Sequence, residues 1–114
     1  MQSEFAYTYE VGVFRHRPYQ IGVRADPSLN DVDSFAVVLF FEQKDGIRIE
    51  IAKIDNSEHD RGEIHLDQYY RSDPTKKDFT IEVDSVYEAD DFLEQNWLRY
   101  AQLYDRNHGT SAVT

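Results

Sequence analysis

The sequence predicts an α+β fold, in which an antiparallel sheet of five to six strands packs on one C-terminal helix. Most of the 114-residue chain alternates between apolar and polar residues, which is the pattern of half-buried strands. Asp45-Gly46 separates two such segments and is a strong signal for a β-hairpin. Only the segment after residue 84 repeats apolar residues at steps of three and four, as a helix packed on a sheet requires. Strands followed by a single helix indicate a meander that the helix closes.

The first two strands are predicted from alternation. Residues 4–14 place an apolar residue at every second position from Phe5 to Val13. Pro18 is expected to break this run, and residues 19–24 then form a second short strand. Residues 26–34 are dense in turn formers, so we expect a polar loop there.

Residues 35–41 are apolar throughout, which is typical of a central strand covered on both faces. Further strands are expected at residues 47–52, 63–70 and 79–83. One helix covers only one face of such a sheet. The sheet must therefore curl into a half-barrel, or its second face must meet a partner, for which a homodimer is the simplest solution.

The helix is predicted to begin after Ser85, because Ser85 and Glu88 form a capping box. Gly109 is expected to lie just beyond its end. Residues 1–109 are thus predicted to form a single α+β domain, and residues 110–114 a flexible tail. The core-facing stripe of the helix comprises Val86, Ala89, Leu93, Trp97, Tyr100 and Tyr104.

Composition limits the classes of function. The chain has no cysteine, which excludes disulfides, zinc-thiolate sites and cysteine nucleophiles. No apolar run is long enough to span a bilayer, and the N-terminus does not resemble a signal peptide. We therefore expect a cytoplasmic protein without membrane contact.

The net charge is -10, from 22 acidic and 12 basic residues. Two interpretations are open, an acidic surface that confers solubility and an adaptation to molar salt. Scarce lysine, abundant aspartate and the lack of cysteine favour the second. Nucleic acid is a poor partner for such a chain unless a local basic patch exists, because affinity comes largely from neutralised phosphates.

The densest cluster of titratable residues lies between residues 55 and 67. His65 and Asp67 are two residues apart on a predicted strand and share one face, and His59 can reach them from the preceding loop. Asp55 lies nearby, and either Asp55 or Asp67 could orient a histidine for proton transfer. Three interpretations are open: a cation site, acid–base catalysis and a simple turn at residues 55–57. With Arg17 to stabilise developing charge, the catalytic set His59, His65, Asp67 and Arg17 would suit metal-independent cleavage of RNA. That set needs no metal and no other cofactor, and we predict none.

A second candidate is the basic run Arg15-His16-Arg17 with the later Arg24. We predict Arg15, His16 and Arg24 as anion-binding residues. The alternative is an exposed loop whose arginines pair with the abundant acids.

Residues 35–41, the Asp45-Gly46 turn, Asp55-Asn56-Ser57 and the following His59 and His65 resemble the central part of TumE-type toxins of toxin–antitoxin pairs. The resemblance implies a small sheet with a C-terminal helix. The chain departs from that pattern in the acidic insert between its histidines and in its overall acidity. Its acidic composition, together with the ending that runs from Asn96-Trp97 to Gly109, is similar to small uncharacterised proteins of halophilic archaea. That likeness implies a lineage and no activity.

The function predicted from the sequence is that of a small cytoplasmic interaction or regulatory domain, related to toxin–antitoxin modules, from a halophilic archaeon. It would act through a protein partner or as a homodimer. The alternative is the metal-independent ribonuclease, and a third hypothesis is a purely structural homodimer. The sequence does not decide whether the protein is an enzyme.

Overall fold

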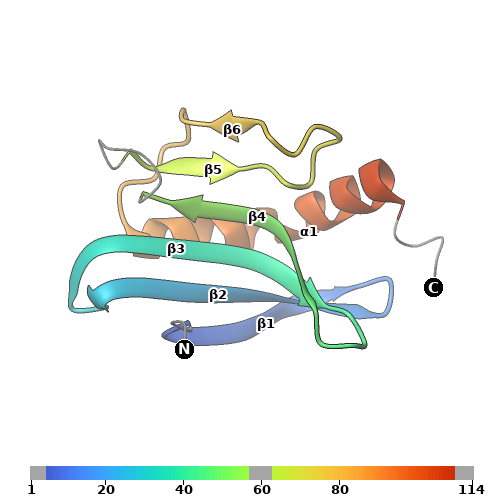
Figure 1. Ribbon diagram of the computed structural model, residues 1–114, viewed down its shortest axis with the longest axis horizontal. Coiled ribbons are helices and arrows are strands. Elements are labelled where there is room, and N and C mark those ends of the chain that lie inside the picture. Colours follow the sequence, from blue (N-terminus) through green and yellow to red (C-terminus); the bar gives the residue numbers. More distant parts are fainter. Residues whose placement is uncertain (1–4, 57–62, 110–114) are drawn as a thin grey trace.

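The computed structural model describes residues 5–56 and 63–109, and it confirms the predicted α+β class (Figure 1). The described strands form one open antiparallel sheet in the order β1-β2-β3-β4-β5-β6, and helix α1 (Val86–His108) lies along one face of it. The strands are β1 (Tyr7–Phe14), β2 (Arg17–Ser28), β3 (Asp31–Glu42), β4 (Arg48–Asp55), β5 (His65–Asp67) and β6 (Lys77–Asp78).

Strand β3 is buried on both faces, as its apolar sequence predicts. Phe35, Val37, Leu39 and Phe41 point towards α1 and belong to the main hydrophobic core. The intervening residues 36, 38 and 40 point to the opposite face and are also buried. β3 is therefore the central strand that positions both faces of the sheet.

The residues before β1 cover part of the second face. The ring of Phe5 stacks on that of Phe40, with 5.7 Å between centroids, and lies directly over Gly22. The guanidinium of Arg48 lies over both rings, 4.7 Å from Phe5 and 4.9 Å from Phe40. From the sequence we expected the second face of the sheet to be covered by curling of the sheet or by a second copy of the chain. Phe5 of the same chain covers part of that face instead. The homodimer stays a prediction.

The turn between β1 and β2 falls earlier than predicted. Arg15 and His16 form a two-residue turn with φ angles of 56° and 65°, and Phe14 pairs with Arg17. Positive φ at both central residues defines a type I′ turn, which matches strand twist but is unfavourable for side chains other than Asn, Asp and Gly. Pro18 does not break the strand but pairs with Val13 within the ladder, so that prediction was wrong.

The predicted loop at residues 26–34 is mostly strand, because β2 extends to Ser28 and β3 begins at Asp31. Only Leu29 and Asn30 connect them. Composition misled here because backbone pairing holds the two segments together while their polar side chains face solvent. The register shifts between Asp26 and Pro27, and a bulge is one of the few places where a ladder tolerates proline.

The last two strands also differ from prediction. β5 covers only part of the expected segment 63–70, and β6 precedes the expected segment 79–83, which is not a strand. The side chain of Asp78 accepts hydrogen bonds from the backbone N–H and the hydroxyl of Thr80, and this local turn ends the ladder. The alternation that suggested a strand arises because Ile81 and Val83 pack against the core without pairing.

Helix α1 has the predicted boundaries. The hydroxyl of Ser85 accepts from the backbone N–H of Glu88, and Gly109 ends the helix with a φ of 64°. Glu88 in turn accepts from the backbone N–H of Asp84, one residue before the cap. Among the described residues, no helix has both the length and the apolar character needed to cross a bilayer.

Candidate functional site

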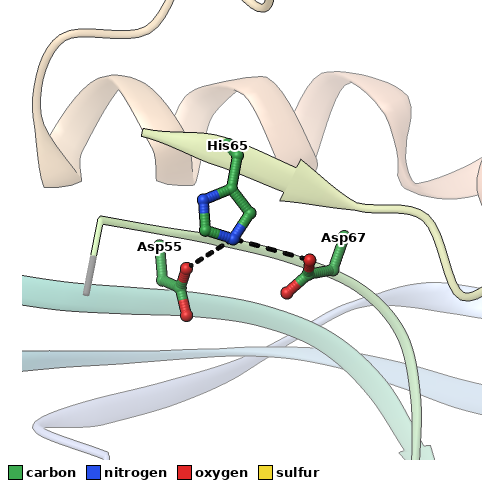
Figure 2. A group of neighbouring side chains, drawn as sticks. All are labelled: Asp55, His65 and Asp67. Atoms are coloured by element: carbon green, nitrogen blue, oxygen red, sulfur yellow. Dashed lines mark ion pairs between the residues drawn. The ribbon is translucent and has the colours of Figure 1, made fainter. Parts of the chain in front are cut away.

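Strand pairing brings His65 and Asp67, two members of the predicted catalytic set, together with Asp55. His65 in β5 lies opposite Asp55 at the end of β4, and Asp67 lies opposite Lys53. Because opposed residues share a face and every second residue returns to it, the three acid–base side chains lie on the face remote from α1. Figure 2 shows the imidazole of His65 pointing towards both carboxylates.

The imidazole Nε2 is 3.0 Å from Oδ1 of Asp55 and 3.5 Å from Oδ1 of Asp67. Two ammonium groups approach the same carboxylates. Lys77 Nζ is 2.5 Å from Oδ1 of Asp67, and Lys53 Nζ lies 3.6 Å from Asp55 Oδ2 and 3.7 Å from Asp67 Oδ2. The cluster therefore alternates carboxylates with cations across three strands.

This cluster is enclosed. The exposed fraction is 4% for Asp55, 0% for His65 and 1% for Asp67. The other ring nitrogen of His65, Nδ1, is 3.2 Å from the backbone carbonyl oxygen of Glu63, and the ring of Phe79 lies over the imidazole at 5.1 Å. General acid–base catalysis requires a nitrogen that reaches a substrate proton, and both nitrogens of His65 face protein atoms.

Charge and burial act in opposite directions on the pKa of Lys53, one of the two lysines of this cluster. Burial disfavours the ammonium form of Lys53, but nearby Tyr69, Asp55 and Asp67 outweigh burial and raise the pKa of Lys53. Tyr69 also donates a hydrogen bond to Asp67, and burial followed by the Asp67 charge raises the pKa of Tyr69. Lys53 therefore stays protonated beside the two carboxylates.

The predicted catalytic set also contains His59 and Arg17, and Arg17 is not part of this cluster. His59 lies outside the described residues. Arg17 opens β2, whereas the row that contains Asp55 crosses β2 seven residues later, at Arg24. At about 3.3 Å per residue this separates Arg17 from the row of His65 by roughly 20 Å. Arg17 also lies over Phe41 on the helix-facing side of the sheet.

Arg17 instead lines a cleft of about 810 Å³ between the β1–β2 turn, the β3–β4 turn and the C-terminal part of α1. Its guanidinium stacks on the ring of Phe41 at 4.0 Å from the centroid. Within the described part of the chain, no carboxylate forms an ion pair with it. Tyr104 lines the same cleft; burial raises the pKa of Tyr104, and Arg17 offsets part of this effect.

The predicted anion-binding residues are divided between two places. Arg15 and His16 line this cleft, and Nε of Arg15 is 3.3 Å from Oδ2 of Asp105 on α1. Arg24 lies further along β2 and pairs with Asp26 at 3.6 Å. Arg24 is thus separated from the other two basic residues.

A scan against protein families matches residues 3–110 to DUF7718, a domain of unknown function. The chain belongs to the DUF7718 family. No curated protein and no solved structure matches it.

Sequence reasoning missed several residues of these two sites in this DUF7718 domain. Lys53 and Lys77 join the buried cluster only through strand pairing, since nothing in the local sequence links them to His65. The alternation Lys53-Ile54-Asp55 could have placed both charges on one face. Lys44 and Tyr104 reach the cleft from other elements and carry no local signal.

Proposed function

We propose that this DUF7718 protein is a small regulatory binding domain that holds a phosphate-bearing small molecule in the cleft beside Arg17. The observation that carries the proposal is the Arg17 guanidinium, stacked on Phe41 and without a carboxylate partner in the described part of a chain that has 22 acidic residues. The guanidinium also lies near the hydroxyl of Tyr19 and lowers the pKa of Tyr19 against the effect of burial. A guanidinium has five N–H donors in a planar fork, so it can still form two parallel hydrogen bonds to an oxyanion.

Two further features support an anionic ligand in this cleft. His16 and Lys44 add basic groups to its lining, against Glu42 and Asp45. The cleft is therefore close to neutral, whereas the chain as a whole repels anions. Arg15 and His16 are also held at positive φ, and strained backbone is concentrated at ligand-binding sites more often than elsewhere.

The test is calorimetric titration of the protein with inorganic pyrophosphate, AMP and ADP at constant ionic strength. We expect saturable binding of at least one of them. Arg17→Gln should weaken that binding by about tenfold to a hundredfold, because a hydrogen bond to a charged group contributes about 1.5–3 kcal/mol.

Arg24→Gln is the matched control, since it removes the same charge from the same strand outside the cleft. It should leave the affinity unchanged. Failure of all three probes to bind, or equal losses in the two variants, would contradict the proposal.

The metal-independent ribonuclease is the second candidate, and the convergence of His65 and Asp67 favours it. The burial of His65 and the position of Arg17 favour the binding domain instead. We expect the wild type to leave single-stranded RNA intact at low and molar salt. Cleavage above the buffer control that His65→Gln abolishes would favour the nuclease.

Lineage, compartment and partner are also parts of this proposal. The net charge of -10 supports a cytoplasmic protein adapted to molar salt, as the resemblance to halophilic archaeal proteins implies. The relation to toxin–antitoxin modules, with action through a protein partner or a second copy, stays a prediction from the resemblance to TumE-type toxins.

Salt adaptation predicts a steep dependence of thermal stability on KCl. Between about 0.1 M and 1 M salt the Debye length falls from about 10 Å to about 3 Å, so repulsion among the acids is screened. We expect the melting temperature to rise by roughly 10 °C over this range, measured by circular dichroism. Sucrose at equal osmolality, which screens no charge, should give a much smaller rise; a flat response to KCl would refute the adaptation.

A further inference from the structure

We propose that Asp55, His65 and Asp67 form a binding site for one divalent transition-metal ion, such as Mn²⁺, Co²⁺, Ni²⁺ or Zn²⁺. The cation set considered from the sequence was His59, His65 and Asp67 with Asp55 nearby, whereas here Asp55 of β4 supplies the third ligand. The site does not depend on the anion-binding cleft, which lies at the other end of β2 and on the other face of the sheet.

The first argument is the spacing of the donor atoms. One ligand atom from each of the three residues lies within 4.8 Å of the others. Nε2 of His65 is 3.0 Å and 3.5 Å from its two carboxylate neighbours. Ligands bound at about 2.1 Å to one ion lie about 3.0 Å apart at right angles and about 3.4 Å apart at a tetrahedral angle. One imidazole with two carboxylates is a mixed nitrogen–oxygen set that suits these ions better than Ca²⁺.

The second argument is the orientation of the imidazole. Nδ1 faces the carbonyl oxygen of Glu63, which can only accept a hydrogen bond. When Nδ1 carries the single proton of a neutral ring, the lone pair of Nε2 points at the two carboxylates. A backbone carbonyl that fixes the Nδ1–H tautomer is the usual support of a metal-bound histidine, and a cation between Nε2 and the carboxylates satisfies all three groups.

The third argument is charge balance. Among the described residues, the ammonium groups of Lys53 and Lys77 carry the charge that faces the two carboxylates, and one divalent ion carries the same charge. The lysine side chains are 26% and 30% exposed, so each can turn outwards to solvent. Metal binding would thus exchange these two ammonium groups for an ion of equal charge.

The probes are Co²⁺, read by its visible absorption, and Mn²⁺ and Zn²⁺, read by calorimetry, on protein dialysed against a chelator. We expect one equivalent to bind. Asp67→Asn and His65→Gln should each lower the affinity by about 100-fold or more, beyond the 10- to 100-fold effect typical of outer-shell partners. Lys77→Gln should raise the affinity by about tenfold, because it removes the competing charge.

His108→Gln is the control, since it removes an exposed histidine outside both the cluster and the anion-binding cleft, and it should bind like the wild type. The proposal is overturned if no ion binds the wild type. It is also overturned if Lys77→Gln fails to raise the affinity or if the control abolishes binding. The wild-type and Lys77→Gln measurements decide the matter even if a ligand variant does not fold, as judged by circular dichroism.

Discussion

Asp90→Ala is expected to lower the free energy of unfolding by about 3 kcal/mol. The hydroxyl of Tyr7 donates to Oδ2 of Asp90 at 2.7 Å, and that of Tyr9 donates to Oδ1 at 2.5 Å. Hydrogen bonds to a charged group contribute about 1.5–3 kcal/mol each, and partial exposure of this site reduces the sum. These two bonds tie the edge strand β1 to the N-terminal half of α1, so denaturant unfolding should report their loss directly.

Asp91→Ala is the matched control for this prediction. It makes the same chemical change one position later on the helix, where the side chain is exposed. A change within about 0.5 kcal/mol is expected there, as for most surface substitutions. Similar losses in the two variants would mean that the tyrosine bonds contribute little.

The same bonds predict sensitivity to alkali. Burial first, and the bond and charge of Asp90 next, raise the pKa values of Tyr7 and Tyr9 above the ordinary value of 10.0. Above pH 10 the unfolded chain releases these protons while the folded chain retains them. Stability from this source is therefore fully present below pH 10 and falls as the pH rises further. Removing the acceptor with Asp90→Ala should make the decline above pH 10 shallower, as measured by urea unfolding at successive pH values.

Sequence patterns predicted correctly those elements whose limits or burial depend on residues close together in the sequence. The limits of α1 follow from Ser85 and Gly109, whose cap interactions reach at most four residues. The burial of β3 follows from its apolar sequence. Residues 79–83 alternate like a strand, but pairing is a contact between distant segments, and the Asp78 turn prevents it. The cover that Phe5 provides over Gly22 is equally non-local, and no pattern indicates it.

In the candidate site, too, features set by neighbouring residues were predicted and features set by contacts between distant segments were not. A period of two residues placed His65 and Asp67 on one face, and the structure has them so. The contact of Asp55 with His65 depends on the register between β4 and β5, which no local sequence pattern specifies. Separation of Arg17 from His65 depends on the length of β2 and on the face that each residue occupies. Closeness in the sequence indicates neither the length of β2 nor the face that each residue occupies.

Gly12→Ala is expected to destabilise the protein by about 2–3 kcal/mol, the upper part of the range for overpacking. A Cβ atom at this position would overlap the indole of Trp97, with one ring carbon at 2.8 Å and a second one closer still. The indole cannot retreat easily, because it packs on the buried ring of Tyr19 at 5.6 Å. Backbone strain plays no part, since Gly12 is not among the glycines with positive φ.

Two variants separate this steric explanation from a general intolerance of side chains at strand glycines. In Gly22→Ala the new Cβ meets Phe5, 2.5 Å away, which lies outside the strands and is less constrained than Trp97, so a loss of about 1 kcal/mol is expected. Trp97→Phe removes the part of the indole that the methyl group introduced by Gly12→Ala would strike. Combining the two changes should therefore cost less than the sum of the single changes, a coupling of about 1 kcal/mol in thermal or urea unfolding. Additive losses, or equal losses at the two glycines, would show that contact with Trp97 is not the cause.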